Sequence, residues 1–554
     1  MLVNEARPAV SLSSAISGWL SGIREWLYRA PVVISAAATL FYLNFMVRGS
    51  VSFNGRTYFT LFDDAMISMK FAKTLASGGG FTWNPGERPI EGITNPLWTV
   101  WMAILHFAPV PEGYVALLVG LSSAACLIAT AFAARELARR LGTSENVSLF
   151  VMVIVAFYYP LVFWSLRGME TGVLACLMIW AMVFAFDQLD APTRERDIKL
   201  AAIAIALVWV RQDAVVFISV LTGFTFVVGG VRARRTATIL AGSMVLALAL
   251  LTLFRLGYYG SALPNTYYLK VTGVSLSERL DRGISSLFAP AMRSHFFAIL
   301  AAIALSVPVL ARTPSKRVAL LALPIAAFLA QAAYSVYVGG DVWELMGYPN
   351  RYLVIAMPGL LVVAVVLMMN LGKAIAEAKF EGRIADLMAR VPVSQSLLAR
   401  VVPVVLIGLM LLQTTVGHAV AAFKIGPAYV EYDRAATQVG LCLRKETDPS
   451  ARIAYTWAGS MPYYADRFGI DLLGKMDAYI AKSKPQIDFQ PGHNKWDYAY
   501  SIDAHRPDIV LQLFRAKHGD HDMIKGRGYH NVARGWPCLA NTFLTPEDVF
   551  VRDK

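Results

Sequence analysis

Long apolar runs set the strongest limit on what this chain can fold into. Most of them hold roughly 17–25 residues, the length of a helix that crosses a lipid bilayer. Only 16% of the 554 residues are charged, where a soluble domain carries about 25%. The runs lie near residues 30–48, 113–134, 146–165, 171–189, 214–230, 236–257, 293–311, 318–338, 350–371 and 401–422, with a shorter one at 198–211. This pattern predicts an all-α polytopic membrane protein with about eleven transmembrane helices.

Clusters of positive charge between the runs predict how the chain is oriented. The net charge of +13 sits mostly beside apolar segments, which indicates membrane topology rather than nucleic-acid binding. The clusters are Arg135/Arg139/Arg140, Arg194/Arg196/Lys199, Arg232/Arg234/Arg235, Arg312/Lys316/Arg317 and Lys373–Arg400. All of them fall on the side of the N-terminus if the short run Pro96–Pro109 is a juxtamembrane or re-entrant helix. We therefore expect a multi-pass membrane protein with a cytoplasmic N-terminus.

The same orientation divides the chain into three parts. Residues 1–29 form a cytoplasmic N-terminus, and residues 30–422 form the transmembrane domain, whose large first outer loop covers 49–112. Residues 423–554 lose the apolar pattern and predict a small α/β domain outside the membrane. Its expected elements are strands at Arg452–Gly459, Ile470–Gly474 and Pro507–Leu513 and a helix start at Ser460–Arg467.

Two of the four cysteines fall in this C-terminal part. Cys442 and Cys538 could form a disulfide if the domain lies in an oxidising compartment. Sequence does not show whether they are close, so two free thiols stay an equal alternative.

An acidic pair in the first outer loop is the strongest candidate for a catalytic site. Asp63 and Asp64 open the segment LFDDAMISMKFAKTLASGGGFTWNPGERPIEGITNP (61–96), in which Ile67, Phe71 and Leu75 recur at helical spacing. Aspartate is favoured at the start of a helix, which explains one of the two carboxylates well and the second poorly. The alternative is that one of them is a general base in a partly dehydrated cavity.

Charged residues recur in four other outer segments. These are SLRGMETG (165–172) with Arg167 and Glu170, WVRQDAV (209–215) with Arg211 and Asp213, FRLGYYGSALPNTYYLK (254–270) with Lys270, and YVGGDVWELMGYPNRY (337–352) with Asp341, Glu344 and Arg351. An interfacial ion pair or snorkelling side chains would explain Arg167 or Glu170 alone as well as function does. Charges between apolar runs cost about 2.5–3.5 kcal/mol each on insertion scales, so we expect Arg211 and Asp213 to face a cavity or each other.

This inventory suits a reaction in which a hydroxyl loses its proton while a lipid phosphate departs. Arg and Lys can stabilise the developing charge of the phosphate without a metal. The chain has no HExxH, Walker, GxSxG or CxxC motif, which disfavours zinc proteases, ATPases and serine hydrolases. Its eight histidines lack ligand spacing, so we expect no obligatory metal or other cofactor, although a divalent cation near Asp63 is compatible with the argument.

The motifs resemble those of the GT-C class of membrane glycosyltransferases, which take sugars from polyprenyl phosphates. The closest resemblance is to the mycobacterial terminal (β-1,2) arabinofuranosyltransferase family. It rests on the DD pair with its helix, NPGERxxE, RGMETG, VR with an acidic residue, FRxGYYGxxxPxT…K and QAxYxxxxGGD, in this order over roughly residues 55–360. Gln212, Asp213 and Val342 depart from the family pattern, as does the spacing from Asp341 to Arg351, which puts the identity of the sugar in doubt.

The resemblance implies transfer of a sugar, with inversion, from a polyprenyl-phosphate donor to a glycan or glycoconjugate hydroxyl at the outer face of a bacterial inner (plasma) membrane. Asp63 or Asp64 would be the base, and arabinofuranose is the first expectation for the sugar. The donor-binding residues implied by motif and loop are Arg167, Glu170, Arg211, Lys270, Asp341 and Arg351. The alternatives are a hexose donor in the same class and a non-enzymatic lipid or sugar transporter, although the repeated halves typical of transporters are not seen.

Overall fold

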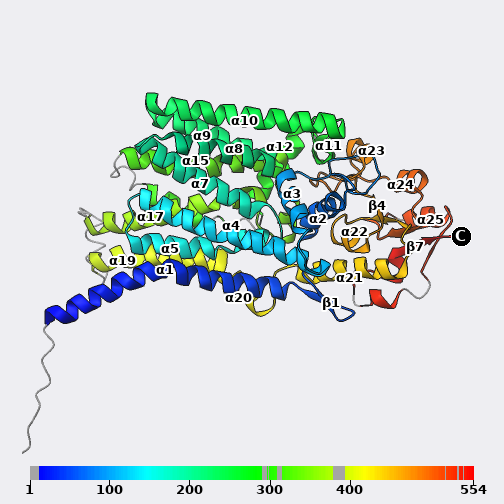
Figure 1. Ribbon diagram of the computed structural model, residues 1–554, viewed down its shortest axis with the longest axis horizontal. Coiled ribbons are helices and arrows are strands. Elements are labelled where there is room, and N and C mark those ends of the chain that lie inside the picture. Colours follow the sequence, from blue (N-terminus) through cyan, green and yellow to red (C-terminus); the bar gives the residue numbers. More distant parts are fainter. Residues whose placement is uncertain are drawn as a thin grey trace, which may run out of the picture.

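The computed structural model describes residues 12–289, 296, 298–307, 315–377, 394–517, 519–532, 536–540 and 542–553. Its long helices lie side by side as a bundle, and the C-terminal residues form a separate layer across one end of it (Figure 1). The helices that hold the first outer loop lie at that same end, between the bundle and the C-terminal layer. The first outer loop and the C-terminal layer therefore gather at one end of an apolar bundle.

The bundle consists of long apolar helices with shorter ones between them. The long helices are α1 (Leu12–Arg48), α4 (Glu112–Arg140), α7 (Thr171–Asp190), α10 (Gly230–Tyr259), α15 (Ser315–Val338) and α17 (Met357–Glu377). The shorter ones are α5 (Glu145–Ala156), α6 (Tyr159–Leu166), α8 (Arg194–Val210), α9 (Val215–Val228), α14 (Ala298–Ser306), α19 (Gln395–Leu411) and α20 (Gly417–Lys424).

The described residues contain six helices that are long and apolar enough to cross a membrane. A seventh span results if α5 and α6, which meet at a bend of 47°, are counted as one. The other predicted runs fall on shorter pieces: α9 follows the 3-10 turn η1 (Gln212–Ala214), and the π-helix η5 (Leu412–Val416) separates α19 from α20. Part of the predicted run 293–311 lies outside the described residues. The fold is thus helical and rich in apolar spans, and the number eleven remains a prediction.

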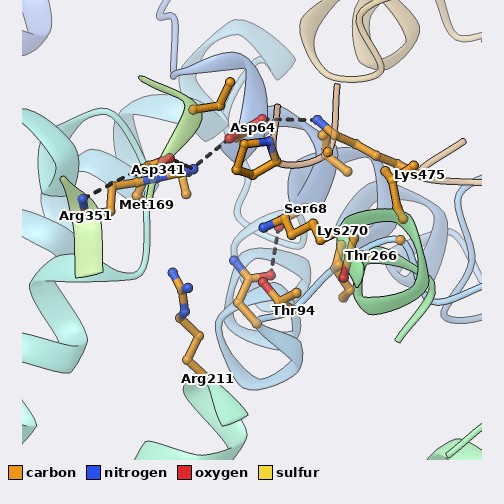
Figure 2. A pocket seen from close by; sticks show the side chains of 18 of the residues that line it. Asp64, Ser68, Thr94, Met169, Arg211, Thr266, Lys270, Asp341, Arg351 and Lys475 are labelled. Atoms are coloured by element: carbon orange, nitrogen blue, oxygen red, sulfur yellow. Dashed lines mark hydrogen bonds and ion pairs between the residues drawn. The ribbon is translucent and has the colours of Figure 1, made fainter. Parts of the chain in front are cut away.

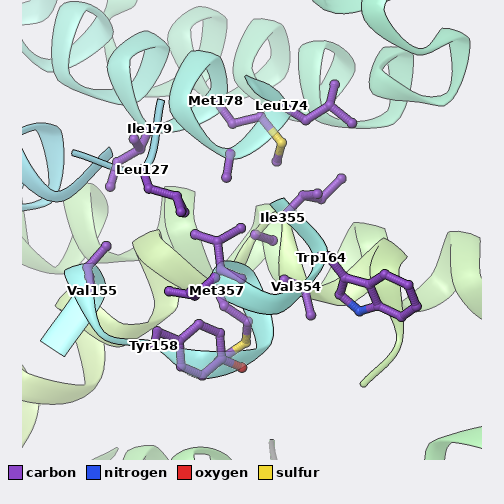
Figure 3. Packing of buried hydrophobic residues seen from close by; sticks show 14 of the residues in the cluster. Leu127, Val155, Tyr158, Trp164, Leu174, Met178, Ile179, Val354, Ile355 and Met357 are labelled. Atoms are coloured by element: carbon purple, nitrogen blue, oxygen red, sulfur yellow. The ribbon is translucent and has the colours of Figure 1, made fainter. Parts of the chain in front are cut away.

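Buried apolar side chains hold the bundle together around α4, α7 and α17. Figure 3 shows Leu127 of α4 packed with Met178 and Ile179 of α7 above Ile355, which follows α16, and Met357, the first residue of α17. All five side chains are at most 5% exposed. Such packing brings the polar ends of these helices to fixed positions relative to one another.

Charged residues close the end of the bundle that lies away from the C-terminal layer. Arg140 at the end of α4 pairs with Asp187 near the end of α7, with Nε 2.6 Å from Oδ1. Arg235 near the start of α10 pairs with Asp197 near the start of α8, with Nε 3.3 Å from Oδ2. Among the described residues, the basic clusters that contain Arg140 and Arg235 thus lie at the same end of the bundle (Figure 1).

The first outer loop supplies short elements at the other end. They are a hairpin of β1 (Val51–Phe53) and β2 (Arg56–Tyr58), followed by α2 (Asp63–Ala76) and α3 (Pro96–Leu105). The acidic residues in the first turn of α2 complement the helix dipole, and Gly78, with φ of +80°, ends the helix in a left-handed turn. The run Pro96–Pro109 contains the short helix α3, whose Trp101 and Ile104 are exposed, as suits a helix at the membrane surface.

Three short elements between the later helices face the same end. They are α11 (Asn265–Val271), α12 (Leu276–Leu287) and the pair formed by the 3-10 helix η4 (Val342–Met346) and α16 (Arg351–Val354). The Asn350 side chain begins α16 by accepting hydrogen bonds from the backbone N–H groups of Tyr352 and Leu353. This cap fixes the direction of Arg351, the first residue of the helix.

A five-stranded sheet forms the centre of the C-terminal layer. Its order is β4-β3-β5-β7-β6, with β3 parallel to β4 and β5, and β7 antiparallel to β5 and β6. The strands are β3 (Arg452–Tyr455), β4 (Phe468–Asp471), β5 (Ile509–Leu511), β6 (Tyr529–Asn531) and β7 (Val549–Arg552). The helices are α21 (Val430–Glu446), α22 (Ser460–Ala465), α23 (Ala478–Lys482), α24 (Tyr498–His505) and α25 (Asp520–Lys525), with the 3-10 turns η6 (Pro537–Leu539) and η7 (Pro546–Asp548). Strands β3, β4 and β5 and helix α22 overlap the segments for which they were predicted.

A disulfide joins Cys442 of α21 to Cys538 of η6, with a Cα–Cα distance of 5.6 Å. The two residues are 96 positions apart in the sequence. The sequence did not decide between a disulfide and two free thiols. In the structure the two cysteines come together because α21 and η6 pack against each other.

Candidate active site

A polar cavity lies where the first outer loop, the loops between the later helices and the C-terminal domain meet (Figure 2). We call it the Asp64 cavity. Its charged lining residues are Asp64, Glu170, Arg211, Lys270, Asp341, Arg351 and Lys475. These residues come from six separate segments of the chain, so only the folded protein brings them together.

Asp64, in the first turn of α2, lies between two cations. Its Oδ2 accepts a hydrogen bond from Arg351 Nη1 at 3.0 Å, and Oδ1 lies 3.3 Å from Lys475 Nζ. The indole of Trp343 also donates to Oδ2, at 3.1 Å. Burial alone would raise the pKa of this carboxyl, but the charges of Lys475 and Arg351 outweigh burial and hold the pKa well below its ordinary value. Asp64 is therefore a carboxylate whose charge is balanced by groups that an anionic ligand would also attract.

Arg351 connects Asp64 to a second carboxylate, Asp341. The guanidinium bonds Asp341 through both of its edges, with Nε 2.7 Å from Oδ2 and Nη2 2.9 Å from Oδ1. Asp341 is 2% exposed. Burial would raise its pKa, but the charge of Arg351 prevails and lowers it. This two-point pairing fixes the plane of the guanidinium, which leaves Nη1 directed at Asp64 (Figure 2).

Arg211, at the end of α8, has a similar pair of anchors. Its Nη1 donates to Glu170 Oε1 at 2.8 Å, and its Nε lies 2.9 Å from Asp213 Oδ1. Glu170 is held in turn by Asn95, whose Nδ2 donates to Oε2 at 2.9 Å. The expectation that Arg211 and Asp213 face a cavity or each other is therefore met in both ways, since Arg211 also lines the Asp64 cavity.

Lys270, at the end of α11, is the cation of this cavity with the fewest restraints. Within the part of the chain that the structure describes, its Nζ has no hydrogen-bond or ion-pair partner within bonding distance. The other three lining cations each contact a carboxylate. Lys270 is thus free to contact an anionic group that enters the cavity.

Two of the residues expected at the site do not line this cavity. Asp63 is 5% exposed, and its Oδ1 accepts a hydrogen bond from the backbone N–H of Ser460 at 2.8 Å. This contact requires a glycine at 459, because a Cβ there would lie 2.0 Å from the carbonyl oxygen of Asp63. Burial raises the pKa of Asp63 to about 6. Asp63 thus anchors the C-terminal domain to the start of α2.

Arg167 is the second residue placed elsewhere. It is 1% exposed and forms an ion pair with Asp433 of α21, which is fully buried. Its Nη1 also lies 3.4 Å from the hydroxyl of Thr60. Of the two alternatives from sequence, an ion pair therefore describes Arg167, whereas Glu170 faces the cavity.

Sequence reasoning missed the residues that the C-terminal domain contributes. Lys475 follows β4, and His493 lies in the loop before α24; both line the Asp64 cavity. Burial and the charge of Lys475 lower the pKa of His493 to about 4, so its ring is neutral near pH 7. No spacing links residues 475 and 493 to residue 64, and the only signal in the sequence was the expectation that the domain and the first outer loop lie on the same side of the membrane.

An apolar cavity of about 280 Å³ adjoins the polar one. The two share Thr94, Arg211, Thr266, Lys270 and Tyr352. The residues found only in the apolar cavity are mainly apolar or aromatic, among them Val215, Leu263, Pro264, Tyr267, Val271, Tyr334, Tyr337 and Val338. Tyr267 and Tyr337 are 39% and 44% exposed. A polar cavity lined with cations thus opens beside an apolar one at the end of the bundle.

Among the described residues, no group of three or more His, Cys, Asp or Glu side chains is placed to hold a metal ion. Two of the acidic side chains that line the cavity, Asp64 and Asp341, share Arg351.

Comparisons with known proteins identify the fold. Residues 427–550 match the model of a domain of unknown function (DUF8728), and no curated protein sequence matches the chain. The structure is similar to the Archaeoglobus fulgidus oligosaccharyltransferase AglB, solved with an inhibitory peptide and a dolichol-phosphate, with a TM-score of 0.52 and 10% identity over 88% of this chain and 69% of AglB.

A second similar structure is ArnT from Cupriavidus metallidurans bound to undecaprenyl phosphate. The TM-score is 0.50, with 14% identity over 79% of this chain and 85% of ArnT. The mycobacterial arabinofuranosyltransferase AftD is too distant to support an assignment, with a TM-score of 0.43 and 16% identity over 80% of this chain and 32% of AftD. At 10% and 14% identity, the likeness shows that this chain shares the fold of AglB and ArnT.

Proposed function

We propose that this protein is a glycosyltransferase that moves a sugar from a polyprenyl monophosphate to a hydroxyl group of a glycan or glycoconjugate. The observation that carries the proposal is the position of Asp64, between Arg351 and Lys475 in a polar cavity that adjoins an apolar one. A lipid-linked sugar needs both environments at once: cations for the phosphate and apolar walls for the chain. Fold similarity to AglB and ArnT, solved with dolichol-phosphate and undecaprenyl phosphate respectively, supports the same assignment.

The donor occupies both cavities in this proposal. Its phosphate lies against Lys270, the unpaired cation at the junction, with Arg211 and Arg351 on either side. The first isoprene units lie along the apolar cavity. Charge-assisted hydrogen bonds from Lys and Arg stabilise the phosphate as it gains negative charge.

Asp64 is the general base in the proposed reaction. The acceptor hydroxyl oxygen attacks the anomeric carbon, and the bond from that carbon to the phosphate oxygen breaks with its electron pair. The hydroxyl proton passes to Asp64, and the products are the new glycoside, with inverted configuration, and polyprenyl phosphate. Donor binding prepares the base: a phosphate that draws Arg351 or Lys475 toward itself weakens their hold on Asp64, which raises the pKa of this carboxyl toward a useful value.

The proposed orientation places this chemistry outside the cytoplasm. The basic ends of the helices lie at the opposite end of the bundle from the Asp64 cavity (Figure 1), and positive clusters favour the cytoplasmic side. The disulfide between Cys442 and Cys538 also suits an oxidising compartment. A cytoplasmic N-terminus and an outer C-terminal α/β domain, residues 423–554, require an odd number of spans, as the predicted eleven would be.

Arabinofuranose is the first candidate for the sugar, on the order of motifs from residue 55 to residue 360. A hexose is the alternative, since Gln212, Asp213 and Val342 depart from the motifs that suggest arabinose. Of these residues, Gln212 and Asp213 line the apolar cavity and Val342 lines the polar one.

The deciding experiment is a transfer assay with the full-length protein in lipid nanodiscs. Synthetic polyprenyl-phosphoryl arabinofuranose and the corresponding hexose donors are offered with a panel of glycan acceptors, and wild type is compared with Asp64→Asn. We expect product with wild type and one donor class only. Absence of product with every donor, from protein that is folded and binds polyprenyl phosphate, would count against the transferase and favour a transporter.

A further inference from the structure

A second polar cavity is lined by parts of the same loops. We call it the Tyr479 cavity. Its walls are residues 87–91 of the first outer loop, residues 259–268 between α10 and α11, and residues 476–505 of the C-terminal domain. Its volume is about 390 Å³, within the range of about 300–1,000 Å³ usual for small-molecule sites.

An aromatic platform forms one side of this cavity. Tyr479 is 54% exposed, and its ring centroid lies 4.1 Å from that of Tyr500 with 31° between the planes. Asp477 holds both tyrosines: its Oδ1 accepts the backbone N–H of Tyr479 at 2.8 Å, and its Oδ2 accepts the hydroxyl of Tyr500 at 3.2 Å. His505 Nε2 lies 3.2 Å from the same Oδ2. Asp477 thus fixes the hydroxyl of Tyr500 and the backbone at Tyr479, and such pre-positioning lowers the entropy cost of binding a ligand.

The charges around the platform balance. Arg88 and Lys482 face Glu87 and Asp477 as lining residues, while Glu91 is neutralised by a two-point ion pair with the buried Arg255. The Asp64 cavity differs, because four cations and three carboxylates line it. A balanced set of donors and acceptors beside an aromatic face fits a neutral polyhydroxylated ligand. Sugar rings have this chemistry, with C–H groups that pack on the negative face of an aromatic ring and hydroxyls that bond to charged side chains.

A thin wall separates this cavity from the Asp64 cavity. Residues 87–91 line the Tyr479 cavity, and residues 92–95, next in the chain, line the Asp64 cavity. In the same way Lys475 lines the Asp64 cavity, and Met476 and Asp477 line the other. Because neighbouring Cα atoms are about 3.8 Å apart, a ligand in the Tyr479 cavity lies within a few sugar units of Asp64.

We propose that the Tyr479 cavity binds sugar residues of the acceptor glycan a few units away from the hydroxyl that receives the new sugar. That the ligand is the acceptor rests on the proposed function. That the ligand is a neutral sugar rests on the residues that line the cavity. It implies that the protein selects glycans long enough to reach both cavities.

The test measures binding and transfer separately, with the full chain in nanodiscs. The probes are neutral oligosaccharides of arabinofuranose, mannose and glucose, each as a disaccharide and as a hexasaccharide. The variants are Tyr479→Ala, Tyr479→Phe, which keeps the ring, and His530→Ala, an exposed control on β6 that lines neither cavity. Binding is measured by isothermal titration calorimetry, and KM is measured for each acceptor that gives product.

We expect one hexasaccharide series to bind wild type and to bind Tyr479→Ala about tenfold more weakly, the size of one aromatic contact. Tyr479→Phe and His530→Ala should bind as wild type does, and KM for the disaccharide should not change in any variant. Equal binding by Tyr479→Ala and wild type, or no binding of any hexasaccharide, would overturn the inference even if transfer is observed. Loss of binding in Tyr479→Ala without transfer from any donor would support the glycan site and count against the transferase.

Discussion

Asp64 Oδ2 lies 3.0 Å from Arg351 Nη1, although the two residues are 287 positions apart in the chain. Arg351 also bonds Asp341 at two points, so one guanidinium joins two carboxylates in the polar cavity that adjoins the apolar one. Without a ligand, the charges of Asp64, Arg351 and Asp341 neutralise one another through these ion pairs. A phosphate that enters it must compete with Asp64, which couples donor binding to the release of the proposed base.

Exchanging each acidic residue of the pair for its amide separates their roles. We expect Asp64→Asn to lower kcat about 10²–10⁴-fold, the usual contribution of a general base, because its amide cannot accept the hydroxyl proton. Asp63→Asn should retain most activity, since an amide oxygen can still accept the N–H of Ser460. Single-turnover transfer assays on both variants decide the matter. Loss of activity only in Asp63→Asn would assign the base to Asp63 instead.

Removing the unpaired lysine should affect the donor and little else. Lys270→Ala deletes one charge-assisted hydrogen bond to the phosphate, worth about 1.5–3 kcal/mol, and should raise KM for the donor roughly 10–100-fold. The free energy of unfolding should change by at most about 0.5 kcal/mol, since no ion pair is lost. Steady-state kinetics with varied donor, together with a thermal melt, test both parts. A large fall in stability with unchanged KM would show that Lys270 is structural.

Sequence and structure agree best where a pattern is local. Apolar runs of twenty residues predicted the long helices such as α4 and α7, since such a run has one stable form in lipid. The run 401–422 was predicted as one span, but η5 interrupts its helix. Hydropathy is averaged over the whole run, so it does not reveal the π-helix η5 within it.

The site shows the same limit. Asp64, Lys270 and Arg351 were recognised as candidates because a charge beside a membrane-spanning run is costly and therefore indicates a function. Lys475 did not, because it lies in a polar domain where lysine is ordinary, and its distance from Asp64 depends on how that domain docks. In the sequence Arg167 resembled the other charged residues of the outer segments. In the structure it forms an ion pair with the buried Asp433 instead of lining the cavity.

Truncating Arg351 should destabilise the protein as well as inactivate it. Arg351→Ala leaves Asp341, which is 2% exposed, as a buried charge without its partner, at a cost of about 3–5 kcal/mol. Asp341→Asn in the same chain should restore part of this loss without restoring transfer. Arg527→Ala is a matched control, because Arg527 pairs with Asp503 at the surface and such pairs contribute about 0–1 kcal/mol. Equal melting temperatures for Arg351→Ala and Arg527→Ala would contradict the prediction.

The disulfide should hold the part of the active site that comes from the C-terminal domain. Replacing Cys442 and Cys538 with Ser should lower the stability of the domain by about 2–5 kcal/mol, and transfer should fall with it because Lys475 loses its position. Cys126→Ala, at a free cysteine of the bundle, is the control. Limited proteolysis of the domain and the transfer assay measure the two effects. Unchanged proteolysis in the double variant would show that the bond adds no stability.

Asp63 predicts a pH dependence of stability that an amide variant isolates. Burial raises the pKa of Asp63 to about 6 in the folded protein, above its value of about 3.9 in an unfolded chain. The folded state therefore binds the proton more tightly, and the resulting stability is complete below pH 4 and is lost as the pH rises through 6. A shift of this size is worth on the order of 3 kcal/mol.

The comparison is between wild type and Asp63→Asn from pH 4 to pH 7.5. Asparagine keeps the hydrogen bond from Ser460 and does not titrate, so its curve lacks this one contribution while all other groups are shared. Wild type should lose stability relative to Asp63→Asn as the pH rises, with most of the change between pH 4 and 6. Chemical denaturation in detergent at each pH measures the difference. Parallel curves would mean that Asp63 has the same pKa in the folded protein as in the unfolded chain. Its side chain would then be accessible to water in the folded protein.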